Sequence, residues 1–134
     1  MNAIDLMKIM GKMGTMFSAK SIEEIIDYCA LMLNDDRVIM ISEDSNPISF
    51  IFYSITDEPE KYLEKEKYQY LTHDKSGKFV YVEKLISFHW NKYLRIIFER
   101  LITSKYPQIE SGVWHRQARW GDRRVISKRR FQNV

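Results

Sequence analysis

The chain has 134 residues, 45% of them hydrophobic and 29% charged, and these ordinary globular values predict one domain over residues 1–134. No apolar run approaches the roughly 20 residues of a membrane span, and the Met-rich start lacks the ordered regions of a signal peptide, so we expect a cytoplasmic protein without membrane contact. Three scattered histidines and one cysteine give no metal-ligand spacing. The net charge is only +3, but residues 116 to 130 contain seven Lys or Arg and one Asp.

Hydrophobic spacing near the start of the chain predicts two helices. Residues 3–16 form the first helix, with Ile4 and Met7 on its apolar face. Ser21 and Glu24 make a capping box that begins the second helix, because each side chain can satisfy a free backbone N–H of the other residue. The apolar stripe of this helix contains Ile22, Ile25, Ile26, Cys29, Ala30 and Leu33. We therefore predict that the single cysteine is a buried structural thiol and not a nucleophile.

The middle of the chain predicts a hairpin and a short helix. β-branched and aromatic residues at 37–42 and 48–55 flank turn-forming residues at 43–47, a pattern typical of two antiparallel strands. Pro59 is suited to the first turn of a helix, because its missing N–H has no partner there, and it opens a helical segment that runs through about Tyr70.

A third strand and a third long helix follow. Residues 79–86 (FVYVEKLI) are rich in β-prone side chains and predict a strand in the interior of the sheet. Residues 91–105 predict a helix that Pro107 ends. One face of this helix carries Tyr93 or Leu94, then Ile97, Phe98, Leu101 and Ile102. The order of elements predicts the α/β (α+β) class: a single mixed, mainly antiparallel twisted sheet flanked by helices.

The C-terminal segment predicts a hairpin whose strands, residues 109–120 and 123–131, are joined by a two-residue turn at Gly121 and Asp122. One face, which can be buried, pairs Trp120 with Arg123, Ala118 with Val125, Arg116 with Ser127 and Trp114 with Arg129. The other face pairs Arg119 with Arg124, Gln117 with Ile126, His115 with Lys128 and Val113 with Arg130. Like charges that face each other cost roughly a few tenths of a kcal/mol per pair, so we expect a counter-anion on this second face.

The basic hairpin has two interpretations, and both stay open. As a binding surface it would follow the phosphates of a nucleic acid or meet an acidic protein surface, with tryptophans that stack or cover arginine. The candidate residues are Arg116, Arg119, Arg124, Lys128, Arg130, Trp114 and Trp120. If the hairpin is instead the edge of the sheet, the same charges would prevent another strand from pairing with it. Seven cations are more than such protection requires.

The predicted interior strand carries a family resemblance. Val80, Val82, Glu83 and Leu85 resemble the strand pattern of the GNAT acetyltransferase superfamily, and the order of segments over residues 22–116 is similar to that family. The resemblance implies a central strand that splays from its parallel neighbour. It also implies that the loop between this strand and the next helix holds the pyrophosphate of acetyl-coenzyme A.

That loop departs from the glycine-rich motif of the family. Residues 87–92 (SFHWNK) contain no glycine, although backbone N–H groups approach phosphate most closely where no Cβ interferes. Ser87, Asn91 and Lys92 are the residues that could cap the helix or meet a phosphate here. Similar glycine-poor versions of the fold occur among toxin-activating lysine acyltransferases, which take acyl groups from a carrier protein, and among bacteriophage internal virion proteins. The resemblance therefore implies acetyl-coenzyme A or acyl carrier protein as the donor.

Glu83 and His89 are the candidate catalytic residues, as a general base and its partner acting on an amine or hydroxyl. Each has a structural alternative, because Glu83 could pair with a neighbouring lysine and His89 could cap a helix. The leading hypothesis is a GNAT-like domain that transfers an acyl group to an amine of a macromolecule or retains only the scaffold. The alternative is a non-catalytic virion-assembly or nucleic-acid-binding protein, in the cytoplasm or the virion, that acts through the basic hairpin with an assembly partner or as a homo-oligomer.

Overall fold

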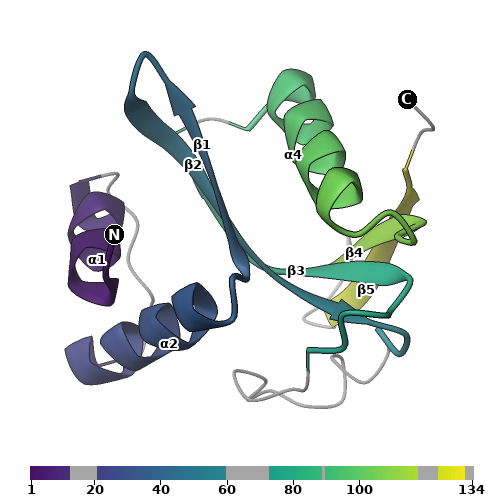
Figure 1. Cartoon of the computed structure of the whole chain (residues 1–134), viewed down its shortest axis with the longest axis horizontal. Helices are drawn as coiled ribbons and strands as arrows, with labels where there is room; N and C mark the ends of the chain where they lie inside the picture. Colours follow the sequence, from purple (N-terminus) through teal and green to yellow (C-terminus); the bar gives the residue numbers. More distant parts are fainter. Residues whose placement is uncertain (13–20, 60–72, 89, 118–123, 132–134) are drawn as a thin grey trace. The chain divides into compact units, whose positions relative to one another are not determined.

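A computed structural model of the chain describes residues 1–12, 21–59, 73–88, 90–117 and 124–131 (Figure 1). These residues contain one five-stranded sheet, in the order β1-β2-β3-β4-β5, and three helices. The elements are α1 (Ala3–Lys12), α2 (Ile22–Asn34), β1 (Val38–Glu43), β2 (Asn46–Thr56), β3 (Phe79–Ser87), α4 (Lys92–Lys105), β4 (Ser111–Gln117) and β5 (Arg124–Arg130). β1 and β2 are antiparallel, as are β4 and β5, whereas β3 and β4 are parallel. The predicted class, a mixed and mainly antiparallel sheet with helices, is confirmed.

The chain forms two compact units, which are described separately below. The N-terminal unit comprises Met1–Phe52 and Lys84–Trp90, and the C-terminal unit comprises Tyr53–Glu83 and Asn91–Val134. Strands β2 and β3 each continue from one unit into the other. The single domain that length and composition predict stays a prediction.

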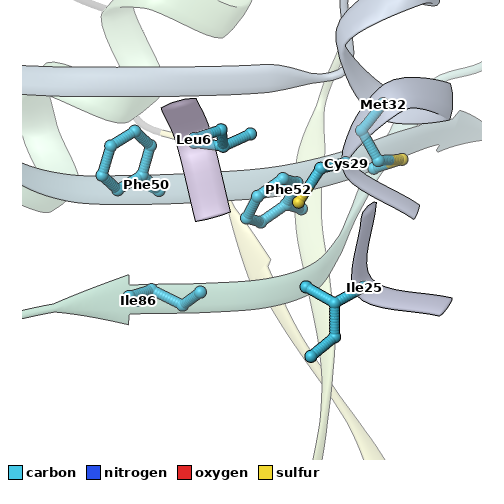
Figure 2. Packing of buried hydrophobic residues seen from close by; sticks show 7 residues of the cluster. All are labelled: Leu6, Ile25, Cys29, Met32, Phe50, Phe52 and Ile86. Atoms are coloured by element: carbon cyan, nitrogen blue, oxygen red, sulfur yellow. The ribbon is translucent and has the colours of Figure 1, made fainter. Parts of the chain in front are cut away.

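A hydrophobic cluster holds the N-terminal unit together. Side chains from α1, α2, β2 and β3 converge in it, as Figure 2 shows. Its buried members are Leu6, Ile25, Cys29, Met32, Phe50, Phe52 and Ile86. The tilted rings of Tyr28 and Phe52 lie with centroids 5.4 Å apart at its edge. β2 is buried without interruption from Ser49 to Thr56, and Phe50 and Phe52 are the residues of this run that belong to the cluster.

Helix α2 begins where the capping box predicts. The backbone N–H of Glu24 donates to Ser21 Oγ at 3.2 Å, and the Ser21 hydroxyl donates to Glu24 Oε1 at 3.3 Å. The carboxylate therefore binds the hydroxyl of Ser21. Ile25 and Cys29 face the core as expected, but Ile22 is 64% exposed, because the first turn of α2 extends beyond the cluster.

The first helix forms as predicted in its described part, but its apolar face differs from the predicted one. α1 ends at Lys12, and residues 13–16 of the predicted helix lie outside the described residues. Leu6 is fully buried and Met7 is half-buried, whereas Ile4 is 49% exposed, so its expected place on the apolar face is wrong. Because several methionines are closely spaced here, the hydrophobic periodicity predicts a helix. It does not predict which side of that helix packs against the core.

The predicted hairpin at residues 37–55 is confirmed, with a tighter turn than expected. Glu43 pairs with Asn46, so the connection is the two residues Asp44 and Ser45. Their φ angles of 51° and 67° are both left-handed, as a type I′ turn requires, and Asp tolerates this region better than most residues. The helical segment predicted from Pro59 to Tyr70 lies outside the described residues beyond residue 59.

In the C-terminal unit, only one face of α4 is buried. The backbone N–H of Leu94 donates to Asn91 Oδ1 at 3.0 Å, which caps the helix N-terminus. Leu94, Phe98 and Ile102 are buried as the spacing predicts. The expected face was too wide, because the other apolar residues are largely exposed: Tyr93 at 76%, Ile97 at 41% and Leu101 at 46%.

The Cys29 thiol is expected to react very slowly with thiol reagents in the folded protein. It has no exposed surface, and burial raises its pKa from 9.0 to about 11. Because the thiolate is the reactive form, this pKa alone lowers the reactive fraction at pH 8 about 100-fold. Labelling with a chromogenic disulfide reagent should therefore be slow before urea is added and fast after. Equal rates in both conditions would contradict the burial of this side chain.

Candidate functional site

Glu83 lies on β3, the strand between β2 and β4, which confirms the interior place predicted for residues 79–86. Its side chain is half-buried, and the Ser54 hydroxyl on β2 donates to Glu83 Oε1 at 3.0 Å. Both residues belong to the C-terminal unit. The hydrogen bond orients one carboxylate oxygen, and partial exposure lets an acceptor approach the group. A carboxylate held in this way can accept a proton.

The end of β3 is tied to β2 in the N-terminal unit. Ser87 Oγ is hydrogen bonded to Ser49 Oγ and also donates to the Ile48 carbonyl at 3.3 Å. The backbone N–H of Phe88 donates to the same carbonyl at 3.2 Å. The hydroxyl that the sequence offers for phosphate binding is therefore used in strand pairing. His89 lies outside the described residues, so its catalytic role stays a prediction.

Asn91 and Lys92 begin α4 in the C-terminal unit. The Asn91 side chain caps the helix, and the backbone carbonyl of Asn91 accepts from the Arg95 N–H at 3.1 Å. An incoming phosphate would have to compete with this cap for the Leu94 N–H. The Lys92 side chain is exposed, and the first turn of α4 contains no acidic residue, so the local charge favours an anion.

The candidate residues divide between the two units. Glu83, Asn91 and Lys92 belong to the C-terminal unit, and Ser87 belongs to the N-terminal unit. Neither unit by itself contains the whole predicted set. Of the two predicted catalytic residues, Glu83 is the one that lies within the described residues.

The structure adds an aromatic cluster that sequence reasoning missed. The rings of Tyr53, His73 and Tyr106 meet edge to face, with centroids 6.3 to 6.4 Å apart. His73 Nδ1 accepts from the Ile55 N–H at 3.0 Å, so the imidazole locks its loop to β2. No sequence signal links these residues, because β2, the loop and the end of α4 are distant along the chain.

The loop from His73 to Lys78 is held in place beside β2. Backbone and side-chain donors of Ser76 bind Asp74 Oδ1 at 3.0 and 2.7 Å, and these bonds hold the pKa of the Asp74 carboxyl below its usual value. A Cβ on Gly77 would lie 2.6 to 2.8 Å from the backbone of Thr56, so glycine is needed for this close approach. These contacts hold the loop against the end of β2.

The C-terminal hairpin forms, but its predicted register is wrong by two residues. The observed pairs are Ser111 with Arg130, Gly112 with Arg129, Val113 with Lys128, Trp114 with Ser127, His115 with Ile126, Arg116 with Val125 and Gln117 with Arg124. Arg124 therefore does not face Arg119, which lies with Trp120 outside the described residues. A shift of two residues keeps each residue on its predicted face of the strand pair.

Contacts at the far end of the hairpin explain this register. The Phe131 N–H donates to the Glu110 carbonyl at 2.9 Å. A Cβ on Gly112 would lie 2.9 Å from the Phe131 ring, so the glycine lets the ring sit directly on β4. These contacts fix the pairing independently of the turn chemistry on which the prediction depended.

The three consecutive basic residues at the end of β5 have different environments. Lys128 and Arg130 are exposed, and Lys128 Nζ lies 4.4 Å from the centroid of the Phe79 ring. Arg129 is half-buried, and its Nε lies 3.3 Å from Oε1 of Glu99, whose side chain is only 7% exposed. Arg129 thus neutralises a buried acid on α4, and the other two remain at the surface. Trp114 is half-buried on β4.

A cleft of about 740 Å³ lies in the C-terminal unit, between the second half of α4 and the end of β5. Arg100, Arg130 and Glu110 contribute charges to its lining, together with the Glu99 side chain that Arg129 neutralises. These charges nearly balance. The cleft therefore offers no strong field for a polyanion.

The Arg129→Met variant is expected to lose about 2 kcal/mol of unfolding free energy. Removal of the guanidinium leaves the buried Glu99 carboxylate without its ion pair, while partial exposure of Arg129 moderates the cost. Urea denaturation should show the loss. Arg130→Met is the matched control, since this neighbouring side chain is exposed and should change stability by less than about 0.5 kcal/mol. Equal stability of the two variants would contradict a structural role for the ion pair.

Metal sites and membrane-spanning helices are two features that the described residues do not contain. No group of three or more His, Cys, Asp or Glu side chains is arranged there to hold a metal ion. Within the same ranges, no helix is long and apolar enough to cross a membrane.

Comparison with known proteins identifies the fold. No protein-family model matches the chain, and no curated protein matches it either. Among solved structures it is similar to the loading GNATL domain of CurA from Lyngbya majuscula, with a TM-score of 0.60 and 16% sequence identity. The match covers 89% of this chain and 63% of that domain, so this chain spans less than two thirds of its length. The resemblance seen in the β3 sequence is confirmed at the level of structure: this chain has a GNAT-like fold.

Proposed function

We propose that this chain is an acyltransferase-type domain that transfers an acyl group to an amine of a macromolecule, with Glu83 as the general base. The half-buried Glu83 carboxylate, held by Ser54 on the interior strand of a GNAT-like fold, carries this proposal. An amine attacks the carbonyl of an acyl thioester only when it is neutral, so a carboxylate that removes its proton accelerates transfer. The new C–N bond replaces the C–S bond, and the donor leaves as its thiol. Glu83 has both the chemistry and the partial exposure for this step.

The strand–helix junction supports a donor that does not depend on the usual coenzyme A loop. Residues 87–92 contain no glycine, and the backbone N–H groups of Phe88 and Leu94 already have intramolecular acceptors. Fewer donors are thus left for a pyrophosphate. As the donor we therefore favour an acyl group carried by an acyl carrier protein over free acetyl-coenzyme A. The similar domain of CurA is described as a loading domain, which agrees with such a role.

Donor binding and acyl transfer to a lysine-rich protein test this proposal directly. We expect a thermal shift and transfer with an acyl carrier protein that bears a short acyl chain, and a weaker response to acetyl-coenzyme A. A specific donor at 100 times its Kd should add about 2.7 kcal/mol to the unfolding free energy. If both donors leave the transition unchanged and no acyl-lysine forms, the enzymatic proposal fails.

A second function is favoured by the surface of β5. A non-catalytic assembly or nucleic-acid-binding protein, in the cytoplasm or in a virion, would use Lys128 and Arg130, which are both exposed. Binding to single- and double-stranded DNA should weaken steeply with salt, because each phosphate contact releases counterions. Lys128→Glu with Arg130→Glu should reduce the affinity and lower the salt slope by about 1 per lost contact. The control is Lys75→Glu, an exposed charge in the loop before β3; equal effects of the two variants would exclude a specific surface.

A further inference from the structure

Helix α4 presents an apolar stripe that the C-terminal unit leaves uncovered. Tyr93, Ile97 and Leu101 are exposed at 76%, 41% and 46%, and they follow one another at intervals of four residues. Residues at this spacing lie one above the other on a helix, so the three side chains form a continuous line. A line of this kind is typical of a surface that receives another helix.

The charges beside this stripe have one sign. Lys92, Arg100 and Lys105 are exposed on α4, and Lys105 Nζ lies 5.8 Å from the Tyr106 ring centroid. Glu99 is the only acidic residue of the helix, and it is buried and paired with Arg129. The exposed face of α4 is therefore apolar and cationic. A partner for it needs apolar side chains flanked by acids.

Helix α2 in the N-terminal unit has these properties. Ile22 is 64% exposed, and the half-buried Ile26 and Ala30 continue from it at the same four-residue spacing. The acids of the helix, Glu23, Glu24 and Asp27, are all exposed, and the segment Ile22–Asn34 contains no Lys or Arg. With 13 residues it also matches the 14 residues of α4 in length.

We propose that α2 of one copy of this chain packs against the exposed face of α4 on a second copy. Opposite charges would draw the two faces together, and the two apolar lines would then be buried between them. If α4 instead packed against α4 of another copy, cations would face cations and repel each other. The pairing of different surfaces is heterologous, so it extends to a chain of copies or closes into a ring.

Sedimentation velocity of the full chain at low and high salt tests this inference. We expect species larger than a monomer at low salt, which dissociate as salt rises. Arg100→Glu with Lys105→Glu should give a monomer, and so should Glu23→Lys with Asp27→Lys. An equimolar mixture of the two variants should assemble again, because each reversed face then meets a complementary face on the other variant.

Glu43→Lys with Lys75→Glu changes two exposed charges outside both faces and should leave assembly intact. Circular dichroism shows whether each variant is folded. A wild-type monomer at low salt, assembly that survives either charge reversal, or a mixture that stays monomeric would each overturn the proposal. None of these readouts depends on acyl transfer, so the proposed function can fail or succeed independently.

Discussion

Glu83→Gln is expected to slow acyl transfer by about 10²- to 10⁴-fold, the usual contribution of a positioned general base. Glutamine has the shape of glutamate, and its carbonyl oxygen can still accept the hydrogen bond that Ser54 donates to Glu83 Oε1 at 3.0 Å. The amide cannot take a proton from the attacking amine. The fold and the donor affinity should therefore be retained while the chemical step is lost.

Initial rates measured across a pH series provide the test, with a saturating donor and a lysine-rich acceptor. The parent enzyme should transfer the acyl group faster than the Gln variant at every pH of the series. Glu43→Gln, an exposed carboxylate at the end of β1, is the control and should keep the parent rate. Ser54→Ala should lower the rate less than Glu83→Gln, because it removes only the group that positions the base. A Gln variant with the parent rate and pH profile would remove Glu83 from the mechanism.

Phe50→Ala is expected to lower the unfolding free energy by about 3 to 5 kcal/mol. Phe50 has no exposed surface, and it lies in the cluster where Leu6 of α1 and Ile86 of β3 meet β2 (Figure 2). The loss combines the transfer free energy of the ring with the cost of the cavity left among side chains from separate elements. Because total stabilities are about 5 to 15 kcal/mol, the variant should unfold well below the midpoint of the parent.

Equilibrium urea denaturation, followed by circular dichroism, measures this effect. Ile4→Ala is the matched control from the same unit, since Ile4 is 49% exposed on α1 and alanine favours helix. It should shift stability by less than about 0.5 kcal/mol. A Phe50→Ala midpoint close to that of Ile4→Ala would mean that this cluster does not hold the N-terminal unit together.

The fold class could be predicted because its signals are local. The Ser21 and Glu24 pair begins α2, the run from Phe79 begins β3, and Asn91 caps α4. Each signal concerns hydrogen bonds or steric preferences within a few residues, so no distant partner is needed to read it. The family resemblance came from the β3 strand together with the order of segments over residues 22–116.

The candidate site could be predicted only in part. The sequence singled out Glu83, but nothing in it indicated that Ser54 would orient the carboxylate or that Ser49 would engage Ser87. These contacts join β2 and β3, whose residues lie 29 and 38 positions apart in the two pairs. The chemistry of a side chain follows from the sequence. The residue that hydrogen bonds to that side chain depends on how the strands pair.

The sequence by itself determined which segments are helices and strands, because capping, periodicity and turn formation are properties of neighbouring residues. Only the tertiary structure decided which face of each helix is buried and which residues pair across strands. It exposed Ile22 and the line that begins at Tyr93, and it placed Arg129 beside the buried Glu99 as its ion-pair partner. Burial and register are set by contacts between distant segments, such as Phe131 on Gly112, and these form only when the chain has folded.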